Sequence, residues 1–258
     1  MSFFHPFRDH RRKALELMPF PMKWSDIIEK NVSCYQGLQA TERDHLEDLI
    51  KVFINEKNFE GCGGLIITDE IKVTVAAQAC LLLLNLKHNY YDQLVSILIY
   101  PAGFKIKQAQ RTAIGTISES DMAVSGLSSS GGVIVLSWPD TIGGSKNEQD
   151  GMNVVFHEFA HQLDQLDGVM NGAPVLGSTS MYREWGSVLS TEYKQLREDV
   201  SRHRHSVIRA YGATQPAEFF AVVTELFFEK PVQLKRDHPE LYEEFKEYYC
   251  QDPATRKE

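Results

Sequence analysis

The feature that most constrains this sequence is the stretch VVFHEFAHQLDQLDG at residues 154–168, in which three residues separate two histidines. On an α-helix, residues four apart point the same way, so His157 and His161 could present both imidazoles to one metal ion. Glu158 would lie too far round the helix to share that coordination, but it could reach a water held by the metal. The apolar residues of the stretch fall on another side and would fix the helix to the core: Phe156, Phe159, Leu163 and Leu166.

The histidine spacing alone does not establish a metal site, because a chain of this composition contains such a string by chance in roughly one case in forty. The context favours a site: the stretch has a helical pattern, follows an expected strand, and ends at Gly168, which is a plausible helix stop. The alternative is a structural helix whose two histidines bind only protein groups.

A catalytic zinc usually takes three protein ligands and leaves the fourth position to water. Asp167 is one candidate for the third ligand, because it lies six residues after His161. That spacing is used where the helix breaks sharply and the chain returns to the metal, and it needs a glycine where this chain has Asp164. With the helix running on, Asp167 would be carried away from the metal.

Glu218 is the second and favoured candidate for the third ligand. It lies near the start of an expected helix in YGATQPAEFFAVVTELFF, where Thr214 is a candidate N-cap and Pro216 suits the first turn. A carboxylate beside so apolar a run is costly unless it is paired or coordinated. Glu225, on roughly the same face, is either a hydrogen-bond partner for a ligand histidine or a solvated charge, and Asp164 has the same two interpretations.

Outside these motifs, the hydrophobic pattern predicts an α+β fold that is mostly helical, with a small mixed sheet beside the helix at 154–168. Residues 1–40 are expected to form an N-terminal arm, irregular over 1–23, and residues 41–258 a single domain. Helices are expected from Thr41, from near Thr68, and over about 148–166, 180–198, 216–230 and 239–249. An apolar strand buried on both faces is expected before Pro101, and a second strand is expected over 133–138. The Ser/Gly stretch before the second strand is expected to be a plain turn.

Composition limits the function classes. A net charge of −8 argues against nucleic acid as a direct ligand, and the basic run Arg8–Lys13 is expected to be a solvated segment, with an electrostatic docking patch as the alternative. His45 is expected to be an ordinary surface histidine. The four cysteines are far apart and form no CxxC pair, which fits a reducing compartment. With no signal-peptide pattern and no apolar run long enough for a membrane span, we expect a soluble cytoplasmic protein.

The two long motifs in this order, HEFAHQLD and YGATQPAEFFAVVTELFF, preceded by GGVIVLSW, resemble the bacterial Mlc titration factor A family of zinc metallopeptidases. The catalytic core of that family is similar to that of anthrax lethal factor. The resemblance covers the chain from about Thr41 to Cys250, and it implies a zincin-like metallopeptidase domain over residues 41–258 that carries one zinc ion.

The resemblance also implies roles for individual residues. His157, His161 and Glu218 would bind zinc, Glu158 would be the catalytic base, and Tyr211 would assist the transition state by donating a hydrogen bond to the oxyanion. For a tyrosine just before a helix, packing is the alternative role.

Two functions follow from the resemblance as expectations. One is aminopeptidase-like hydrolysis of a peptide substrate. Independently of the resemblance, the strand expected at 133–137 could accept an extended peptide along its edge. The other is a binding protein that sequesters a transcriptional repressor of the Mlc type, and the two can coexist. A purely structural zinc site is disfavoured, because closed sites take four protein ligands.

Overall fold

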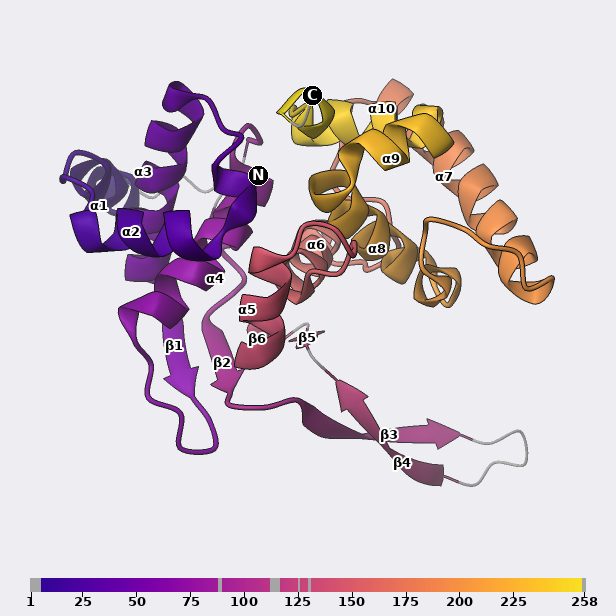
Figure 1. Cartoon of the computed structure of the whole chain (residues 1–258), viewed down its shortest axis with the longest axis horizontal. Coiled ribbons are helices and arrows are strands. Elements are labelled where there is room, and N and C mark those ends of the chain that lie inside the picture. The colour runs from indigo at the N-terminus through magenta and orange to yellow at the C-terminus, as the bar shows by residue number, and fades with distance from the viewer. Residues whose placement is uncertain (1–5, 88–89, 112–116, 125, 130, 257–258) are drawn as a thin grey trace.

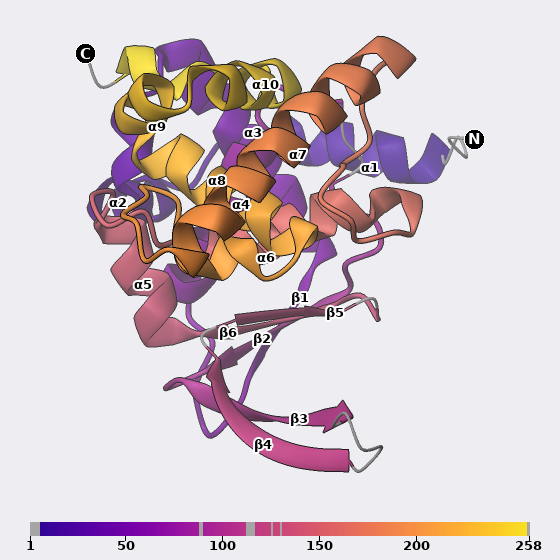
Figure 2. The ribbon, with the colours of Figure 1, turned by 90° about the vertical axis from the view of Figure 1, so that its right-hand side faces the viewer.

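The computed structural model describes residues 6–87, 90–111, 117–124, 126–129 and 131–256. Within these ranges the chain is mostly helical, and the helices gather on one side of a small sheet (Figures 1 and 2). The α-helices are α1 Pro6–Glu16, α2 Met22–Asn31, α3 Ala40–Glu56, α4 Asp69–Leu83, α5 Trp138–Lys146, α6 Val154–Asp164, α7 Thr179–Ser201, α8 Pro216–Glu229, α9 Pro231–Asp237 and α10 Pro239–Tyr249. The strands are β1 Asn58–Gly61, β2 Ser96–Tyr100, β3 Phe104–Arg111, β4 Ile117–Val124, β5 Gly126–Ser129 and β6 Val133–Ser137.

The main sheet is mixed and has the strand order β1-β2-β6-β5. The first three strands are parallel, with Ile97 of β2 opposite Ile134 of β6, whereas β5 runs antiparallel to β6. Strands β3 and β4 pair with each other in a separate antiparallel ribbon, which extends away from the helices (Figure 2). The sheet is therefore small and mixed, as the sequence predicts.

Helix α6 carries the histidine motif and lies at the centre of the molecule, in contact with α4, α8, β5 and β6. Its apolar side is buried as expected. The Phe159 ring lies 5.0 Å from the ring of Tyr91 and 5.8 Å from that of Phe53, and Phe156 lies 5.2 Å from Phe228. Truncating a buried phenylalanine typically costs about 3–5 kcal/mol, so this packing holds the helix firmly in place.

The start of α6 differs from the prediction of a helix from about residue 148. Asn153 is the N-cap, and its side-chain oxygen accepts hydrogen bonds from the backbone N–H groups of Val155 and Phe156. At the other end, a short 3-10 turn leads into Gly168, whose φ of 93° is in the left-handed region. The predicted stop at Gly168 is confirmed.

The prediction of an irregular segment over residues 1–23 was wrong for residues 6–16; residues 1–5 lie outside the described residues. Residues 6–16 form α1, which packs on α3, and Arg12 is a buried side chain that forms ion pairs with Glu56 at 2.7 Å and Asp92 at 3.0 Å. Arg8 also reaches Asp92, at 2.9 Å. The expectation of a solvated segment is therefore wrong for Arg8 and Arg12, which pair with acidic groups of the body of the protein, whereas Arg11 and Lys13 are exposed.

Three expectations about the strands need correction. Strand β2 buries Ile97 and Ile99, while its alternate residues are only partly covered, so one face and not both is fully buried. The Ser/Gly stretch contains β5, where a plain turn was expected. Because β5 and β2 pair with its two sides, β6 has no free edge to accept a peptide. Strands β1 and β5 are the edges of this sheet.

The helix caps are partly as expected. Thr68 caps α4 and accepts a hydrogen bond from the backbone N–H of Ile71. Helix α3 begins one residue before Thr41, because Gln39 and Glu42 form a capping box. Helix α8 begins at the expected proline, but Thr214 caps the preceding 3-10 turn instead. None of the described helices is long and apolar enough to cross a membrane. None of the four cysteines is in a disulfide within the described part of the chain.

Candidate metal centre

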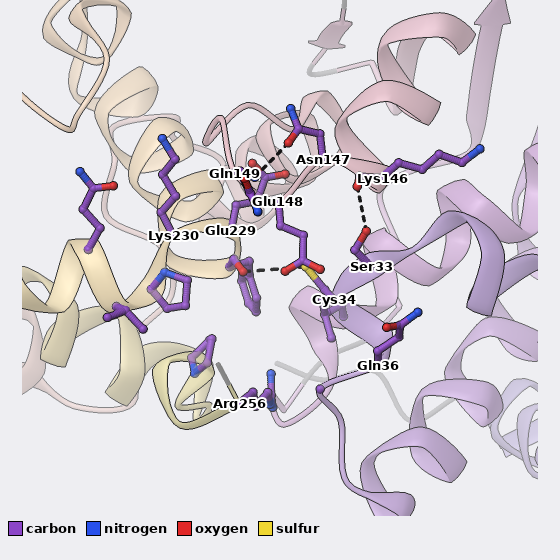
Figure 3. A pocket seen from close by; sticks show the side chains of 17 residues that line it. Ser33, Cys34, Gln36, Lys146, Asn147, Glu148, Gln149, Glu229, Lys230 and Arg256 are labelled. Carbon is purple, nitrogen blue, oxygen red and sulfur yellow. Dashed lines mark hydrogen bonds between the residues drawn. The ribbon is translucent and has the colours of Figure 1, made fainter. Parts of the chain in front are cut away.

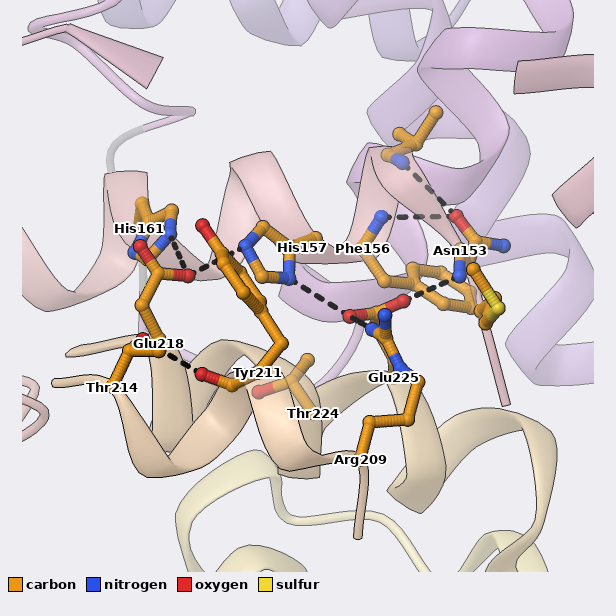
Figure 4. Close-up of polar contacts among 12 residues, drawn as sticks. Asn153, Phe156, His157, His161, Arg209, Tyr211, Thr214, Glu218, Thr224 and Glu225 are labelled. Atoms are coloured by element: carbon orange, nitrogen blue, oxygen red, sulfur yellow. Dashed lines mark hydrogen bonds and ion pairs between the residues drawn. The ribbon is translucent and has the colours of Figure 1, made fainter. Parts of the chain in front are cut away.

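Helices α6 and α8 face each other and bring His157, His161 and Glu218 together (Figure 4). One potential ligand atom from each side chain lies within 4.8 Å of the other two. Glu218 Oε2 is 3.0 Å from His157 Nε2 and 3.5 Å from His161 Nε2. The first turn of α8 positions the glutamate, and successive turns of α6 position the histidines.

The spacing of these atoms fits a divalent metal. Two bonds of about 2.0–2.1 Å at a tetrahedral angle place their ligand atoms roughly 3.3 Å apart, and the two measured separations lie on either side of that value. Two imidazoles and one carboxylate form a three-ligand set that leaves one tetrahedral position free. The residues present therefore fit a metal of the zinc type.

The other ring nitrogen of His157 is fixed by a buried carboxylate. His157 Nδ1 lies 2.8 Å from Glu225 Oε1, while Glu225 Oε2 accepts a 2.6 Å hydrogen bond from the backbone N–H of Asn153. With a proton on Nδ1, the imidazole presents Nε2 to the metal position. The open question about Glu225 is thus resolved in favour of a histidine partner, whereas no described atom forms a hydrogen bond with the buried Nδ1 of His161.

Charges in the cluster shift two pKa values in opposite directions. Burial alone would lower the pKa of His157, but its hydrogen bonds to Glu218 and Glu225 outweigh burial and raise the pKa to about 10. Burial would raise the pKa of Glu218, yet hydrogen bonds from His157 and His161 hold it well below its ordinary value. In the absence of a metal, His157 therefore shares a proton with the negative carboxylate of Glu218, and a metal bound at this point would displace that proton.

Glu158 follows the first histidine on α6 and is almost fully buried. Burial raises its pKa to about 7, although the neighbouring histidines act in the opposite direction. The side chain fits closely against β5: a Cβ atom built at Gly126 would lie 2.5 Å from Glu158 Oε1 and 2.5 Å from a methyl carbon of Val154. Only glycine allows β5 to lie this close to the carboxyl group.

Tyr211 lies in a 3-10 turn just before α8, next to the cluster. Its ring centroid is 5.9 Å from that of His157, and the residue is 46% exposed, so it is not a packed core side chain. Burial of the hydroxyl and the charge of Glu218 raise its pKa to about 12. The phenol therefore keeps its proton at neutral pH and remains a hydrogen-bond donor.

A cleft of about 510 Å³ opens beside the cluster, and His157, Glu158, Tyr211 and Gly126 contribute to its walls. Residues of α5 and the loop after it form the other side. A larger hollow of about 770 Å³ lies elsewhere, between the segment near Cys34 and the C-terminal helices, and contains none of the cluster residues (Figure 3). The smaller cleft is the one with access to the candidate metal position.

The other polar candidates lie outside the cluster. Asp167 is exposed, and its carboxylate accepts a hydrogen bond from the backbone N–H of Val169, two residues on. Asp164 is fully buried, and its two carboxylate oxygens share the backbone N–H of Gly172 in a bifurcated hydrogen bond, so it holds the following loop. His45 is exposed on α3, as expected.

Comparison with known proteins gives the family. Residues 7–250 match the family described as glucose-regulated metallo-peptidase M90. The chain belongs to this M90 family. Among its relatives, an uncharacterized protein of Synechocystis sp. is 42% identical over 246 residues, covering 95% of this chain and 90% of the relative. Mlc titration factor A of Klebsiella pneumoniae subsp. pneumoniae is 30% identical over 239 residues (92% and 88%), and that of Serratia proteamaculans is 28% identical over 254 residues (97% and 94%).

Membership of M90 makes this a metallopeptidase-type protein.

Three residues near the metal cluster were not predicted from the sequence. Asn153 could have been found, because asparagine before an apolar helical run is a common N-cap. Gly126 and Arg209 carry no local signal. Gly126 matters because it lies against Glu158, and Arg209 matters because it pairs with Glu225. Both contacts join distant parts of the chain.

Proposed function

We propose that the protein is a zinc-dependent metallopeptidase with aminopeptidase-like activity, formed by a zincin-like domain over residues 41–258. The observation that carries the proposal is the convergence of His157 Nε2, His161 Nε2 and Glu218 Oε2 on one point beside a buried glutamate. These three side chains would hold one zinc ion per chain. Bound zinc supplies Lewis-acid activation of a water molecule and of the substrate carbonyl.

Glu158 is the proposed general base. It lies on the cleft wall beside the metal position but is not among the three ligands, so its carboxylate can accept a proton from the attacking water. The same group then donates that proton to the leaving amine. Tyr211, exposed to the cleft and protonated at neutral pH, would donate a hydrogen bond to the oxyanion that develops on the carbonyl.

Strand β5 is the proposed docking edge for the peptide substrate. It is an edge strand of the main sheet, it contacts α6, and its first residue, Gly126, lines the cleft. An extended peptide that paired with this edge would pass beside Glu158 with its backbone hydrogen bonds satisfied.

A second function is favoured by the relatives. Those of Klebsiella and Serratia are named for titration of Mlc. By analogy, this chain would bind a transcriptional repressor of the Mlc type and thereby remove it from its operator. This activity needs a protein surface and not a hydrolytic centre, so both functions can exist in one molecule.

The assignment of the third ligand is tested by two carboxylate variants. Glu218→Ala should weaken zinc binding by orders of magnitude, because it removes one of three ligands. Asp167→Ala is the matched control, since it removes an acidic group a few residues beyond the motif whose carboxylate only accepts a bond from a turn. Zinc content would be measured by elemental analysis after dialysis against a weak chelator. Full zinc in Glu218→Ala, or loss in Asp167→Ala alone, would contradict the assignment.

A further inference from the structure

Arg209 lies at the junction of three parts of the site: the cleft, the buried carboxylate behind His157, and the turn that carries Tyr211. Its guanidinium Nη2 donates to Glu225 Oε1, the oxygen that also faces His157 Nδ1 (Figure 4). Its backbone carbonyl accepts a 2.9 Å hydrogen bond from Gly212, within the 3-10 turn. One residue therefore links α8, α6 and the start of that turn.

The buried carboxylate of Glu225 requires a nearby positive charge to stabilise it. The carboxylate is buried, and burying an ionised carboxylate is costly unless it is paired. Its ion-pair partners among the described residues are His157 and Arg209. A histidine that coordinates a metal through Nε2 donates its Nδ1 proton as a neutral ring, so the guanidinium is then the permanent positive charge that offsets the carboxylate.

We propose that Arg209 is a positioning residue for the metal ligand His157, and that it acts through Glu225. The guanidinium keeps the carboxylate in place, and the carboxylate orients the imidazole so that Nε2 points at the metal position. Arg209 is not one of the three candidate metal ligands. This role rests on the proposed zinc site. Loss of Arg209 would change metal affinity directly, and turnover through the metal.

The test uses the full chain and measures zinc binding directly. Arg209→Met keeps much of the side-chain length without the charge. It should raise the zinc dissociation constant severalfold, up to the roughly 10- to 100-fold cost of losing the direct partner of a ligand histidine, which here is Glu225. Arg209→Lys keeps the positive charge but lacks the planar guanidinium group, so its loss of zinc affinity should be smaller than that of Arg209→Met. Arg204→Met is the control, because Arg204 is an arginine five residues away whose ion-pair partners Glu198 and Asp199 lie outside the cluster.

A double-mutant cycle shows whether Arg209 acts through Glu225. In a Glu225→Gln background, Arg209→Met should add less than a threefold change in the dissociation constant, because the carboxylate that it holds is gone. The visible absorption spectrum of the cobalt-substituted protein should shift in Arg209→Met and stay unchanged in Arg204→Met. Circular dichroism confirms that each variant is folded.

Three results would overturn the inference: a zinc affinity of Arg209→Met within twofold of the Arg204→Met control, equal losses in the Met and Lys variants, or fully additive effects in the cycle. The peptidase proposal fails separately, if the zinc-loaded wild type hydrolyses no peptide while the zinc affinities still follow the expected order. Wild-type protein that binds no zinc would overturn both proposals.

Discussion

Glu229→Gln should change the pH dependence of stability. Glu229 is the last residue of α8, one turn beyond Glu225, and only 2% of it is exposed. Burial, together with the negative charge of Glu225, raises its pKa from an ordinary 4.5 to about 9, although hydrogen bonds with Asn153 and Met152 act in the opposite direction. At neutral pH the side chain is therefore a neutral acid, which glutamine imitates in shape and charge.

The sign of the effect follows from proton binding. Between pH 4.5 and 9 the folded wild type keeps the proton on Glu229, whereas the unfolded chain has released it. The wild type therefore loses stability as the pH rises, by up to about 1.4 kcal/mol per pH unit. This contribution is fully present below pH 4.5 and is lost as the pH approaches 9. Glutamine does not titrate, so from pH 5 to 8 the variant should gain up to about 4 kcal/mol relative to the wild type.

The assay is urea unfolding of both proteins at pH 5, 6, 7 and 8, with a chelator present so that metal binding does not contribute. The difference in the free energy of unfolding between variant and wild type isolates Glu229, because the other titrating groups are common to both. Glu240→Gln, at an exposed position in the first turn of α10, controls for the loss of one negative charge. A difference that stays constant within about 0.5 kcal/mol across this range would refute the reasoning, since a raised pKa requires a slope.

Two further substitutions test the cleft. Gly126→Ala should lower turnover at least tenfold with zinc retained, because the new Cβ would collide with the Glu158 carboxyl group. Gly186→Ala is the control, because Gly186 is exposed on α7, away from the cleft, and its new Cβ would meet no atom within 4 Å; it should leave turnover unchanged. Equal effects of the two alanines would contradict this. Tyr211→Phe should lower kcat by less than Glu158→Gln does, with little change in KM, because it removes one hydrogen-bond donor to the oxyanion; a change confined to KM would indicate a substrate-binding role instead.

The parts of the site that follow from helical periodicity could be predicted from the sequence. The period of α6 places His157 and His161 on one face and Phe159 on the other, and both placements are confirmed. Glu218 was favoured over Asp167 because a carboxylate in an apolar run needs a partner, and the structure brings it to the histidines. The local helical pattern and the cost of burying an unpaired charge were sufficient to predict the three residues of the cluster.

The remaining features depend on contacts that local sequence does not encode. The arginines of α1 are indistinguishable from a solvated run until Arg12 meets Glu56, 44 residues away. Strand β5 has a composition typical of a turn, and pairing with β6 makes it a strand. Arg209 and Gly126 gain their importance only when they meet Glu225 and Glu158, respectively.

The most direct test of the proposed activity is turnover of aminoacyl chromogenic substrates by Glu158→Gln, measured beside its zinc content. The substitution keeps the shape of the side chain and leaves His157, His161 and Glu218 unchanged. Zinc should remain near one ion per chain, while turnover should fall at least about a hundredfold, as expected when a general base is lost. A zinc-loaded Glu158→Gln protein with full peptidase activity would contradict the mechanism, and binding of a repressor would then become the leading account of this protein.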